Sequence, residues 1–269
     1  TQEIEISTPF PNAIVTVFNS DSSYYNQVAL SQGVPNTIYL NTTAQGLQST
    51  YGAISTQLGN QVLDRAALFV RSDRDIVLTQ RVTQQYNQDL LSAKGTRALG
   101  KLFLAGNQTK IVNAPPAGEA ALGFISFVAI ENNTSVSVNL PPGITDKNGD
   151  NIISCVLNKW QSYTVTLDED EQFAGASIIS SKPISVTTGA NHVKQNAGGP
   201  EQDGGMDQLV PQDLVGNEYV IARGLAPASL DYLVIIPTDD NTNISANGSL
   251  VANKNKSEVF EYTLAGGPG

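Results

Sequence analysis

Short runs of alternating polar and apolar residues are the feature of this sequence that most restricts its fold. Glu3–Ile6 reads Glu-Ile-Glu-Ile, and the same alternation runs through Ser135–Leu140 and Ser162–Leu167. Successive side chains of a β-strand point to opposite faces, so each run places its apolar residues on one face. Each run therefore predicts a strand with one face in a core and the other in water.

Turn-forming residues separate these runs. Pro141–Gly143 reads Pro-Pro-Gly, Lys147–Asp150 reads Lys-Asn-Gly-Asp, and Asn247–Ser249 reads Asn-Gly-Ser. Gly and Asn tolerate the positive φ that tight hairpin turns need, so short strands joined by such turns indicate antiparallel pairing. The best helix candidates, Gln84–Leu91 and Gln208–Val215, are too short to change the fold class. The sequence therefore predicts an all-β antiparallel sandwich or barrel.

The sequence also repeats itself. Phe124–Val136 aligns with Tyr232–Ile244, and Ser72–Thr79 aligns with Ser180–Thr187, and both pairs are 108 positions apart. We interpret each member of the first pair as a buried strand, an acidic-Asn-Thr hairpin turn and a return strand. Self-similarity at one spacing in two separate places indicates a repeated structural unit.

A third aligned pair has a longer spacing. Asp89–Gly106 aligns with Asp207–Gly224 at 118 positions. The ten additional residues fit within Gln195–Gly205, which is rich in glycine. Such a stretch is expected to form a surface loop.

These alignments predict tandem antiparallel β-sandwich-like units from an internal repeat of about 108 residues, with an incomplete third unit. The expected N-terminal strand segment, first unit, second unit and partial third unit are 1–15, 16–123, 124–231 and 232–269. A hairpin with a strand or two cannot bury a hydrophobic face alone. The partial unit is therefore expected to pack on the second unit, on residues 1–15 or on a neighbouring chain. Ile4 and Ile6 are the candidate assembly residues, because the N-terminal strand could add to a neighbour.

Composition and charge restrict the setting and the partners. Charged residues make up 15% of the chain, against about 25% in typical soluble domains, and small polar residues take their place. This composition predicts a secreted or cell-surface β-protein. The net charge is −10 with no offsetting basic cluster, so nucleic acid, which needs a basic surface, is not an expected partner. No apolar run approaches the roughly 18 residues of a membrane span, so no transmembrane segment is expected.

Cysteine and histidine are too few for several kinds of site. Cys155 is the only cysteine, so no intramolecular disulfide can form, and its apolar neighbours predict burial on a strand. Cys155 and the single histidine, His192, cannot supply a zinc site. No nucleophile signature accompanies His192, which is expected to be an exposed or packing residue. The chain is therefore not expected to be an enzyme, and no catalytic or cofactor-binding residue is assigned.

Calcium is the one cofactor that the acidic residues suggest. Asp146, Asn148 and Asp150 imitate the start of an EF-hand loop, but Leu157 occupies the twelfth position, where Glu is expected. A plain Asn-Gly hairpin explains the same residues. A second acidic cluster comprises Glu201, Asp203 and Asp207. Two alternatives stay open. The chain binds no cofactor, or it binds calcium at the first cluster.

Five segments of the expected second unit carry a family resemblance. They are Val128–Val138, Leu157–Val165, Gly175–Ala190, Met206–Gln212 and Gly216–Val220. In this series they resemble the N-terminal domain of IgGFc-binding proteins, a family of mucus-associated animal proteins and exported bacterial proteins, often found beside adhesion modules. The resemblance covers roughly residues 120–262 well and the first unit only weakly. It implies the fold family and an exported setting more than a particular function.

The chain departs from the family pattern at one place. The family usually has Cys-Asp-His just before a Leu-Val/Glu-Gln segment, where this chain has Met206, Asp207 and Gln208. The difference removes a disulfide and a ligand or proton carrier. Immunoglobulin binding, the property that named the family, is therefore not carried over.

Three functions are compared. The first is a non-catalytic binding or adhesion module that meets a glycan or protein ligand on a surface through loops such as 195–205. The second is a structural subunit that assembles with copies of itself into a fibre or sheath by β-strand addition. The third and most remote is a carbohydrate-active enzyme with paired carboxylates, for which Asp203 and Asp207 are the residues to mutate.

Overall fold

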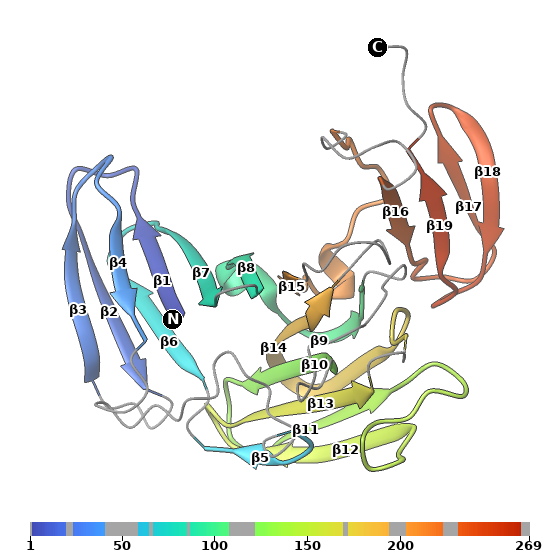
Figure 1. The fold of residues 1–269 in the computed structure, drawn as a ribbon, viewed down its shortest axis with the longest axis horizontal. Coiled ribbons are helices and arrows are strands. Elements are labelled where there is room, and N and C mark those ends of the chain that lie inside the picture. The colour runs from blue at the N-terminus through green and yellow to red at the C-terminus, as the bar shows by residue number, and fades with distance from the viewer. Residues whose placement is uncertain are drawn as a thin grey trace.

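A computed structural model of the chain contains antiparallel β-strands and two short 3-10 helices in the part that it describes. The described residues are 2–19, 24–40, 59–64, 67–84, 87–107, 122–168, 172–193, 203–222 and 231–264. The strands fall into three groups, which Figure 1 shows at the left, at the bottom and at the upper right. The prediction of an all-β antiparallel fold is confirmed.

The first group is a sandwich of two sheets. One sheet has the order β4-β1-β7-β8 and the other has the order β3-β2-β6. Their bounds are Gln2–Ser7 (β1), Ala13–Asn19 (β2), Tyr24–Leu30 (β3), Asn36–Tyr39 (β4), Leu68–Ser72 (β6), Val77–Gln84 (β7) and Asn87–Ser92 (β8). The alternating residues Ile4 and Ile6 of β1 and Val15 and Val17 of β2 are buried in the core of this sandwich.

The N-terminal strand belongs to this first sandwich. β1 pairs with β4 along one edge and with β7 along the other. Residues 1–15, expected as a separate segment, thus supply β1 and the start of β2 to the first core. Of the two alternatives for this strand, pairing within its own chain is the one that the structure has.

The second group is a curved eight-stranded sheet that is nearly closed around the main core. Its strands are Val62–Leu63 (β5), Leu99–Leu104 (β9), Leu122–Ala129 (β10), Thr134–Asn139 (β11), Ile152–Leu157 (β12), Ser162–Asp168 (β13), Ser177–Val193 (β14) and Asp203–Gln208 (β15). Phe103 of β9, Ile125 and Phe127 of β10, and Ile184 and Val186 of β14 are each at most 1% exposed. Because Phe103 packs in this core, β9 belongs to the second group.

β14 organises the second group and is 17 residues long. Its first part, Ser177–Ser180, pairs with β11, and its later part, Ile184–Ala190, pairs with β10. Its opposite edge pairs with β9 and then with β15. Pro183, which has no backbone N–H, lies where the ladder to β9 shifts register. Bends of this kind let one strand serve two parts of a curved sheet.

Glu131–Thr134, expected as a hairpin turn, is instead a corner, where the chain bends without folding back on itself. The hairpin prediction is therefore wrong. β10 and β11 do not pair with each other, because both run antiparallel to β14 and follow one another along its edge. The helix candidate Gln84–Leu91 is also wrong, since β8 occupies most of it. The other candidate holds only a 3-10 turn, Gln212–Leu214 (η2). A second 3-10 helix, Gly95–Ala98 (η1), precedes β9.

The third group is one long bent hairpin. Tyr232–Ile235 (β16) pairs with Phe260–Thr263 (β19), and Thr242–Ala246 (β17) pairs with Ser249–Lys254 (β18). The turn between β17 and β18 is Asn247-Gly248, with φ of 49° and 80°. Positive φ at both central residues is what a two-residue hairpin turn needs, so the Asn-Gly prediction is confirmed here.

The corner between β10 and β11 has the same internal bonds as the corner between β16 and β17. Asn133 and Asn241 both have positive φ, 54° and 56°. The next residues, Thr134 and Thr242, each donate a hydroxyl hydrogen bond to the carbonyl three positions earlier, at 2.8 and 2.7 Å. The two corners therefore share a backbone conformation and the bond that closes it.

The turns of the partner strands, between β12 and β13 and between β18 and β19, also match. In Asn158–Gln161 and Asn255–Glu258, the first N–H donates to the side-chain oxygen of the fourth residue, at 2.7 and 2.9 Å. The third residue has a φ of 71° and 66°, respectively. Its N–H donates to the carbonyl of Ala129 in the second group, at 2.7 Å, and of Pro237 in the third, at 3.0 Å.

Each of these two turns contacts the group of strands that precedes its own group in the chain. The Trp160 ring lies 4.5 Å from the ring of Phe69 in β6. Ser257, at the same place in its own corner, lies so close to Gly175 that a Cβ there would collide with the Ser257 carbonyl oxygen. Gly175 has a φ of 89°, which also favours glycine.

Candidate binding surface

The candidate site is the outward face of β12, β11 and β14. The register places Ser137 of β11 between Ser154 of β12 and Ile179 of β14. The flanking residues of β11, Val136 and Val138, point the other way and are buried in the main core. Burial of that inner face holds the outward side chains in fixed places.

Three rows of three side chains make up this outward face, which we call the serine face. The rows are Ile152, Asn139, Ser177; then Ser154, Ser137, Ile179; and then Val156, Ser135, Ser181. Ile152 and Val156 are each 62% exposed, and Ile179 is 48% exposed. Hydroxyls and exposed aliphatic side chains thus share one face, and none of the nine residues carries a charge.

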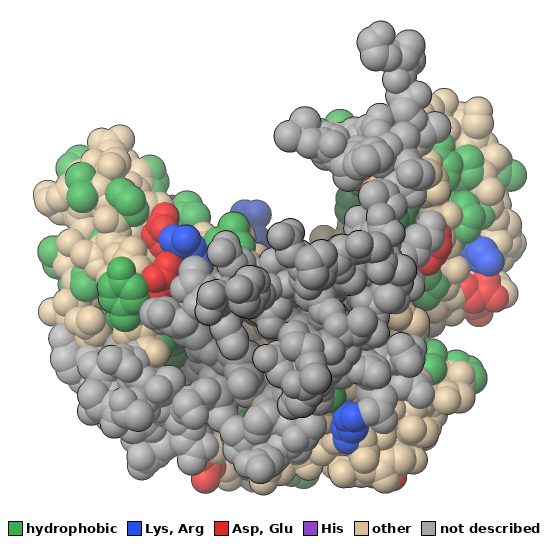
Figure 2. Space-filling view, in the orientation of Figure 1, with side chains coloured by type: hydrophobic (Ala, Val, Ile, Leu, Met, Phe, Trp, Pro, Cys, Tyr) green, Lys and Arg blue, Asp and Glu red, His purple; other side chains and the backbone are tan. Residues whose placement is uncertain are grey.

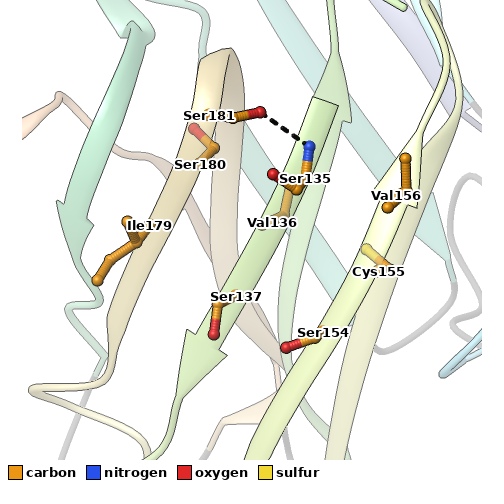
Figure 3. Close-up of a pocket in the computed structure, with 9 residues that line it drawn as sticks. All are labelled: Ser135, Val136, Ser137, Ser154, Cys155, Val156, Ile179, Ser180 and Ser181. Atoms are coloured by element: carbon orange, nitrogen blue, oxygen red, sulfur yellow. Dashed lines mark hydrogen bonds between the residues drawn. The ribbon is translucent and has the colours of Figure 1, made fainter. Parts of the chain in front are cut away.

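A shallow groove of about 680 Å³ lies over the serine face (Figure 3). Its lining includes Ser135, Ser137, Ser154, Ile179 and Ser181. Ser135 donates its backbone N–H to Ser181 Oγ at 3.0 Å, the dashed bond in Figure 3. This bond links the edge of β11 to β14 and fixes one hydroxyl at the groove.

Cys155 lines the same groove from β12 and packs, partly buried, against the main core. Burial raises the pKa of its thiol from 9.0 to about 11. The thiol therefore stays protonated at physiological pH, and the thiolate is the form that reacts as a nucleophile. Nearby Tyr163 has its pKa raised to about 12, mainly by burial and then by Cys155, Asp146 and Asp150.

The groove offers hydroxyl and aliphatic groups from its lining. None of its lining residues is a carboxylate, a histidine or a lysine, so the serines have no partner there to take a proton. His192 lies in β14, and its side chain is outside the described part of the structure. Hydroxyls beside aliphatic side chains can instead donate and accept hydrogen bonds with an uncharged partner surface.

The first sandwich has a different outward face at the comparable place. There the row across β3, β2 and β6 is Gln27, Thr16 and Arg71. Gln27 Nε2 donates to Thr16 Oγ1 at 3.1 Å, and the Arg71 guanidinium lies 5.5 Å from the centre of the Phe69 ring. Arg71 therefore gives this row a charge that the serine face lacks.

The structure places Asp146, Asn148 and Asp150 in one loop, which Asp146 closes with one carboxylate oxygen. Asp146 is 4% exposed, and its Oδ1 accepts the backbone N–H groups of Asn148 and Asp150, both at 2.9 Å. Asp146 Oδ2 is buried without a hydrogen-bond partner. In the described ranges, no three or more His, Cys, Asp or Glu side chains group as metal ligands. Calcium at this loop stays a prediction.

The other sequence candidates are dispersed. Asp207 of β15 forms an ion pair with Lys94 Nζ at 2.5 Å, and Lys94 also donates to the carbonyl of Gln208. Asp203 begins β15, whereas Glu201 and residues 195–202 lie outside the described part. Ile4 and Ile6 are 3% and 0% exposed in the first core, so their role in assembly stays a prediction.

Sequence reasoning missed the serine face. The alternation in Ser135–Leu140 was visible, with its polar positions filled only by Ser and Asn. The missing information was that β14 pairs beside β11, because that register brings Ile179 and Ser181 to the same face.

By class, the described part of the chain is an all-β protein of antiparallel sheets, one of which is nearly closed. The model of the family described as IgGFc binding protein matches residues 91–267, more than half of the chain. The chain therefore belongs to this family, and the resemblance is confirmed. Comparison with curated proteins and comparison with solved structures find no match.

The family sets the coarse function. It is a family of binding domains rather than of catalytic domains, and its proteins are typically extracellular. Within the described residues, none of the helices has the length and apolar character that crossing a membrane requires.

Proposed function

We propose that this chain is a non-catalytic binding module of an exported or cell-surface protein, and that it meets its ligand with the serine face. The observation that carries the proposal is a neutral face of hydroxyl and exposed aliphatic side chains on a chain with a net charge of −10. Protein interfaces are depleted of charge at their centre and combine apolar contacts with hydrogen bonds. An uncharged surface of a protein ligand therefore fits this face better than an anionic or a cationic ligand does.

A matched pair of lysine variants tests the proposal. Ser137→Lys puts a charge at the centre of the serine face, whereas Thr16→Lys puts one at the comparable place of the first sandwich. Binding of immobilised mucin, extracellular-matrix proteins, neutral glycans and immunoglobulin Fc is measured by surface plasmon resonance. We expect at least one protein ligand to lose about tenfold or more in affinity with Ser137→Lys and little with Thr16→Lys.

Two results would contradict this proposal. One is a panel in which no protein ligand binds the wild-type chain. The other is a ligand whose affinity is the same for both lysine variants. Fc binding is not expected, because Met206, Asp207 and Gln208 replace the Cys-Asp-His of the family pattern.

Calcium binding is a separate, testable property of the same module. The buried, unpartnered Asp146 Oδ2 is the observation that favours it over a plain turn. Millimolar calcium should then raise the melting temperature of the wild-type chain but not that of Asp146→Asn. If the wild-type chain melts at the same temperature with calcium and with a chelator, the calcium site is rejected and these residues form only a turn.

The proposed architecture is a tandem one, with three copies of a bent-strand unit. The matched corners at Asn133 and Asn241 support it, since they lie 108 positions apart and share their φ and their hydroxyl bond. The first copy includes β1, so its start moves from residue 16 to residue 2. The second copy is centred on 124–231, with β5 and β9 added from the preceding part, and the third lies within 232–269.

A second candidate function is a structural subunit that assembles by β-strand addition. The half-buried state of all four residues of β16 favours it, because a strand of a completed sheet would bury alternate side chains. A carbohydrate-active enzyme is not proposed, because the family is one of binding domains.

A further inference from the structure

β12 is the edge strand of the curved eight-stranded sheet and lies at the bottom of the second group in Figure 1. It pairs with β11 in an unshifted register, and no described strand pairs with its other edge. The edge of a sheet presents a row of backbone N–H and C=O groups that can pair with a further strand. β12 is therefore a place where another strand can be added.

The ladder to β11 shows which backbone groups of β12 point to this edge. Leu140 donates its N–H to the Asn151 carbonyl at 3.0 Å, so Asn151 directs its polar groups toward β11. Alternate residues of an antiparallel strand direct theirs to opposite edges. The polar groups of Ile152, Ser154 and Val156 therefore point away from β11.

β12 lacks the features that usually keep a sheet edge from pairing. Those features are charged residues, proline and bulges, whereas β12 reads Ile-Ile-Ser-Cys-Val-Leu. Ile152 and Val156 are each 62% exposed, so two branched aliphatic side chains flank the edge. In Figure 2, the described part of the lower rim is mostly tan, the colour of uncharged polar side chains and backbone. An uncharged strand can therefore approach without meeting a charge on β12.

The sequence of β12 is complementary to itself in the antiparallel orientation. One register places Ser154 opposite Ser154 of a second copy, and Ile152 opposite Val156 of that copy. All three residues that point to the edge then exchange backbone hydrogen bonds in both copies, whereas any shifted register leaves at least one of them out. Branched aliphatic side chains directly opposite one another also stabilise antiparallel strands.

The charges at the two ends of β12 fit the same arrangement. Asp150 precedes the strand and Lys159 follows it, and both residues are exposed. Antiparallel pairing brings the start of one β12 to the end of the other, so each acidic residue lies at the same end as a basic residue of the second copy. Parallel pairing would place like charges together. Charge complementarity therefore favours an antiparallel second copy.

We infer that β12 pairs with β12 of a second copy about a two-fold axis, and that the chain dimerises through this edge. The same strand serves both copies, as an interface with two-fold symmetry requires. The two curved sheets then become one continuous sheet. A single pair of strands is smaller than a standard protein interface, so the dimer is weak and depends on concentration.

The dimer has a consequence for the serine face. Ile152, Ser154 and Val156 belong to both the serine face and the paired edge. The two-fold axis between antiparallel strands is perpendicular to the sheet, so both serine faces lie on the same side and form one surface. This consequence rests on the proposed function, whereas the dimer itself does not.

Sedimentation velocity of the full chain tests the dimer over a range of concentrations. About 0.15 M salt screens the repulsion between two chains of net charge −10. Ser154→Pro removes an edge N–H without removing a bond to β11, and Ser154→Thr keeps that N–H. We expect the dissociation constant of the dimer to rise at least about tenfold in Ser154→Pro and to stay near the wild-type value in Ser154→Thr.

A second pair of variants does not involve proline. Val156→Lys places a charge on the edge, whereas Val77→Lys changes a valine of similar exposure, 59%, in the first group. Val156→Lys should weaken the dimer at least about tenfold, and Val77→Lys should leave it unchanged. Ser137→Lys should also dimerise as the wild type does, so failure of the serine face and failure of the dimer are distinguishable.

Cross-linking tests the register. Ser154→Cys in a Cys155→Ala chain should be joined by a linker of about 8 Å, because directly opposite residues of this kind lie about 5.5 Å apart. Ser137→Cys in the same background is the control, since it lies one strand farther from the axis on each side, about 15 Å from its counterpart. Equal cross-linking of the two variants would overturn the register.

Hydrogen exchange followed by NMR separates a second copy from another segment of the same chain. The amides of Ile152, Ser154 and Val156 should exchange rapidly at low concentration and slowly at high concentration. Slow exchange in the dilute monomer would show that another segment covers this edge, and would overturn the dimer. Monomers alone at up to about 1 mM chain would overturn it as well, as would oligomers that Val156→Lys leaves unchanged.

Discussion

At the scale of single residues, a few unusual backbone conformations set the corners of the fold. Asn133 and Asn241 have positive φ, where Asn is one of the few tolerated residues besides Gly. Each precedes a threonine whose hydroxyl closes the turn. The sequence showed these residues as turn formers, but it did not show that the chain bends there without reversing.

Replacing Asn133 tests that conformation. Asn133→Ala should lower the free energy of unfolding by about 1 kcal/mol, because a Cβ is unfavourable at this φ unless a short polar side chain compensates. Asn133→Gly should cost less, since glycine adopts positive φ readily. Urea unfolding of both variants measures the difference. A glycine variant less stable than the alanine variant would contradict the assignment.

The Cys155 thiol gives a pH dependence with a definite sign. Its pKa rises from 9.0 to about 11 on folding, so the unfolded chain loses this proton at a lower pH than the folded chain. The stability linked to the thiol is therefore fully present below pH 9 and is lost as the pH rises through 11. The urea midpoint should fall over this range, and less so in Cys155→Ala. Tyr163 contributes a similar fall, because its pKa rises to about 12.

The thiol should also react slowly in the folded chain. Labelling with a disulfide reagent should increase with pH toward a midpoint near 11, whereas the urea-unfolded chain should show a midpoint near 9. Equal midpoints in the two states would show that the thiol is not desolvated.

At the scale of elements, local patterns predicted strands well and their pairing poorly. Alternation located β1, β11 and β13, and the Asn-Gly turn between β17 and β18 was confirmed. The helix candidate that became β8 failed because a mostly polar segment of this length is too short to show a decisive hydrophobic period. The corner after β10 was mistaken for a hairpin because pairing with β14, about fifty residues away, decides which edge the next strand joins.

The candidate site depends on the same long-range pairing. Ser135 and Ser137 were visible as outward residues of a strand, but their neighbours Ile179 and Ser181 come from β14. No local pattern fixes that register, which follows from burial of the opposite face. The strand could therefore be predicted from the sequence, whereas the serine face could not.

The strand β9 and its proposed counterpart give a matched test of element packing. Phe103→Ala should destabilise the chain by about 3–5 kcal/mol, because it empties a fully buried position of the main core. Ile221→Ala, at the corresponding position of 217–222, should change stability by no more than about 0.5 kcal/mol, because that side chain is half-exposed. Chemical denaturation measures both. Similar losses would contradict the difference in pairing between the two segments.

At the scale of the whole molecule, one bent-strand plan accounts for the arrangement. The second and third groups each contribute a corner that contacts the group before it, through Trp160 on Phe69 and through Ser257 on Gly175. β9 passes from the end of the first group into the second, so neither group is built from one stretch of chain alone. The third group repeats the paired half of this plan in β16–β19.

Native-state hydrogen exchange of the free chain, followed by mass spectrometry, tests this plan most directly. Amides of β9, β10 and β14 should be the most protected, and those of 217–222 should exchange at least about 100-fold faster. Protection of 217–222 equal to that of β9 would contradict the account.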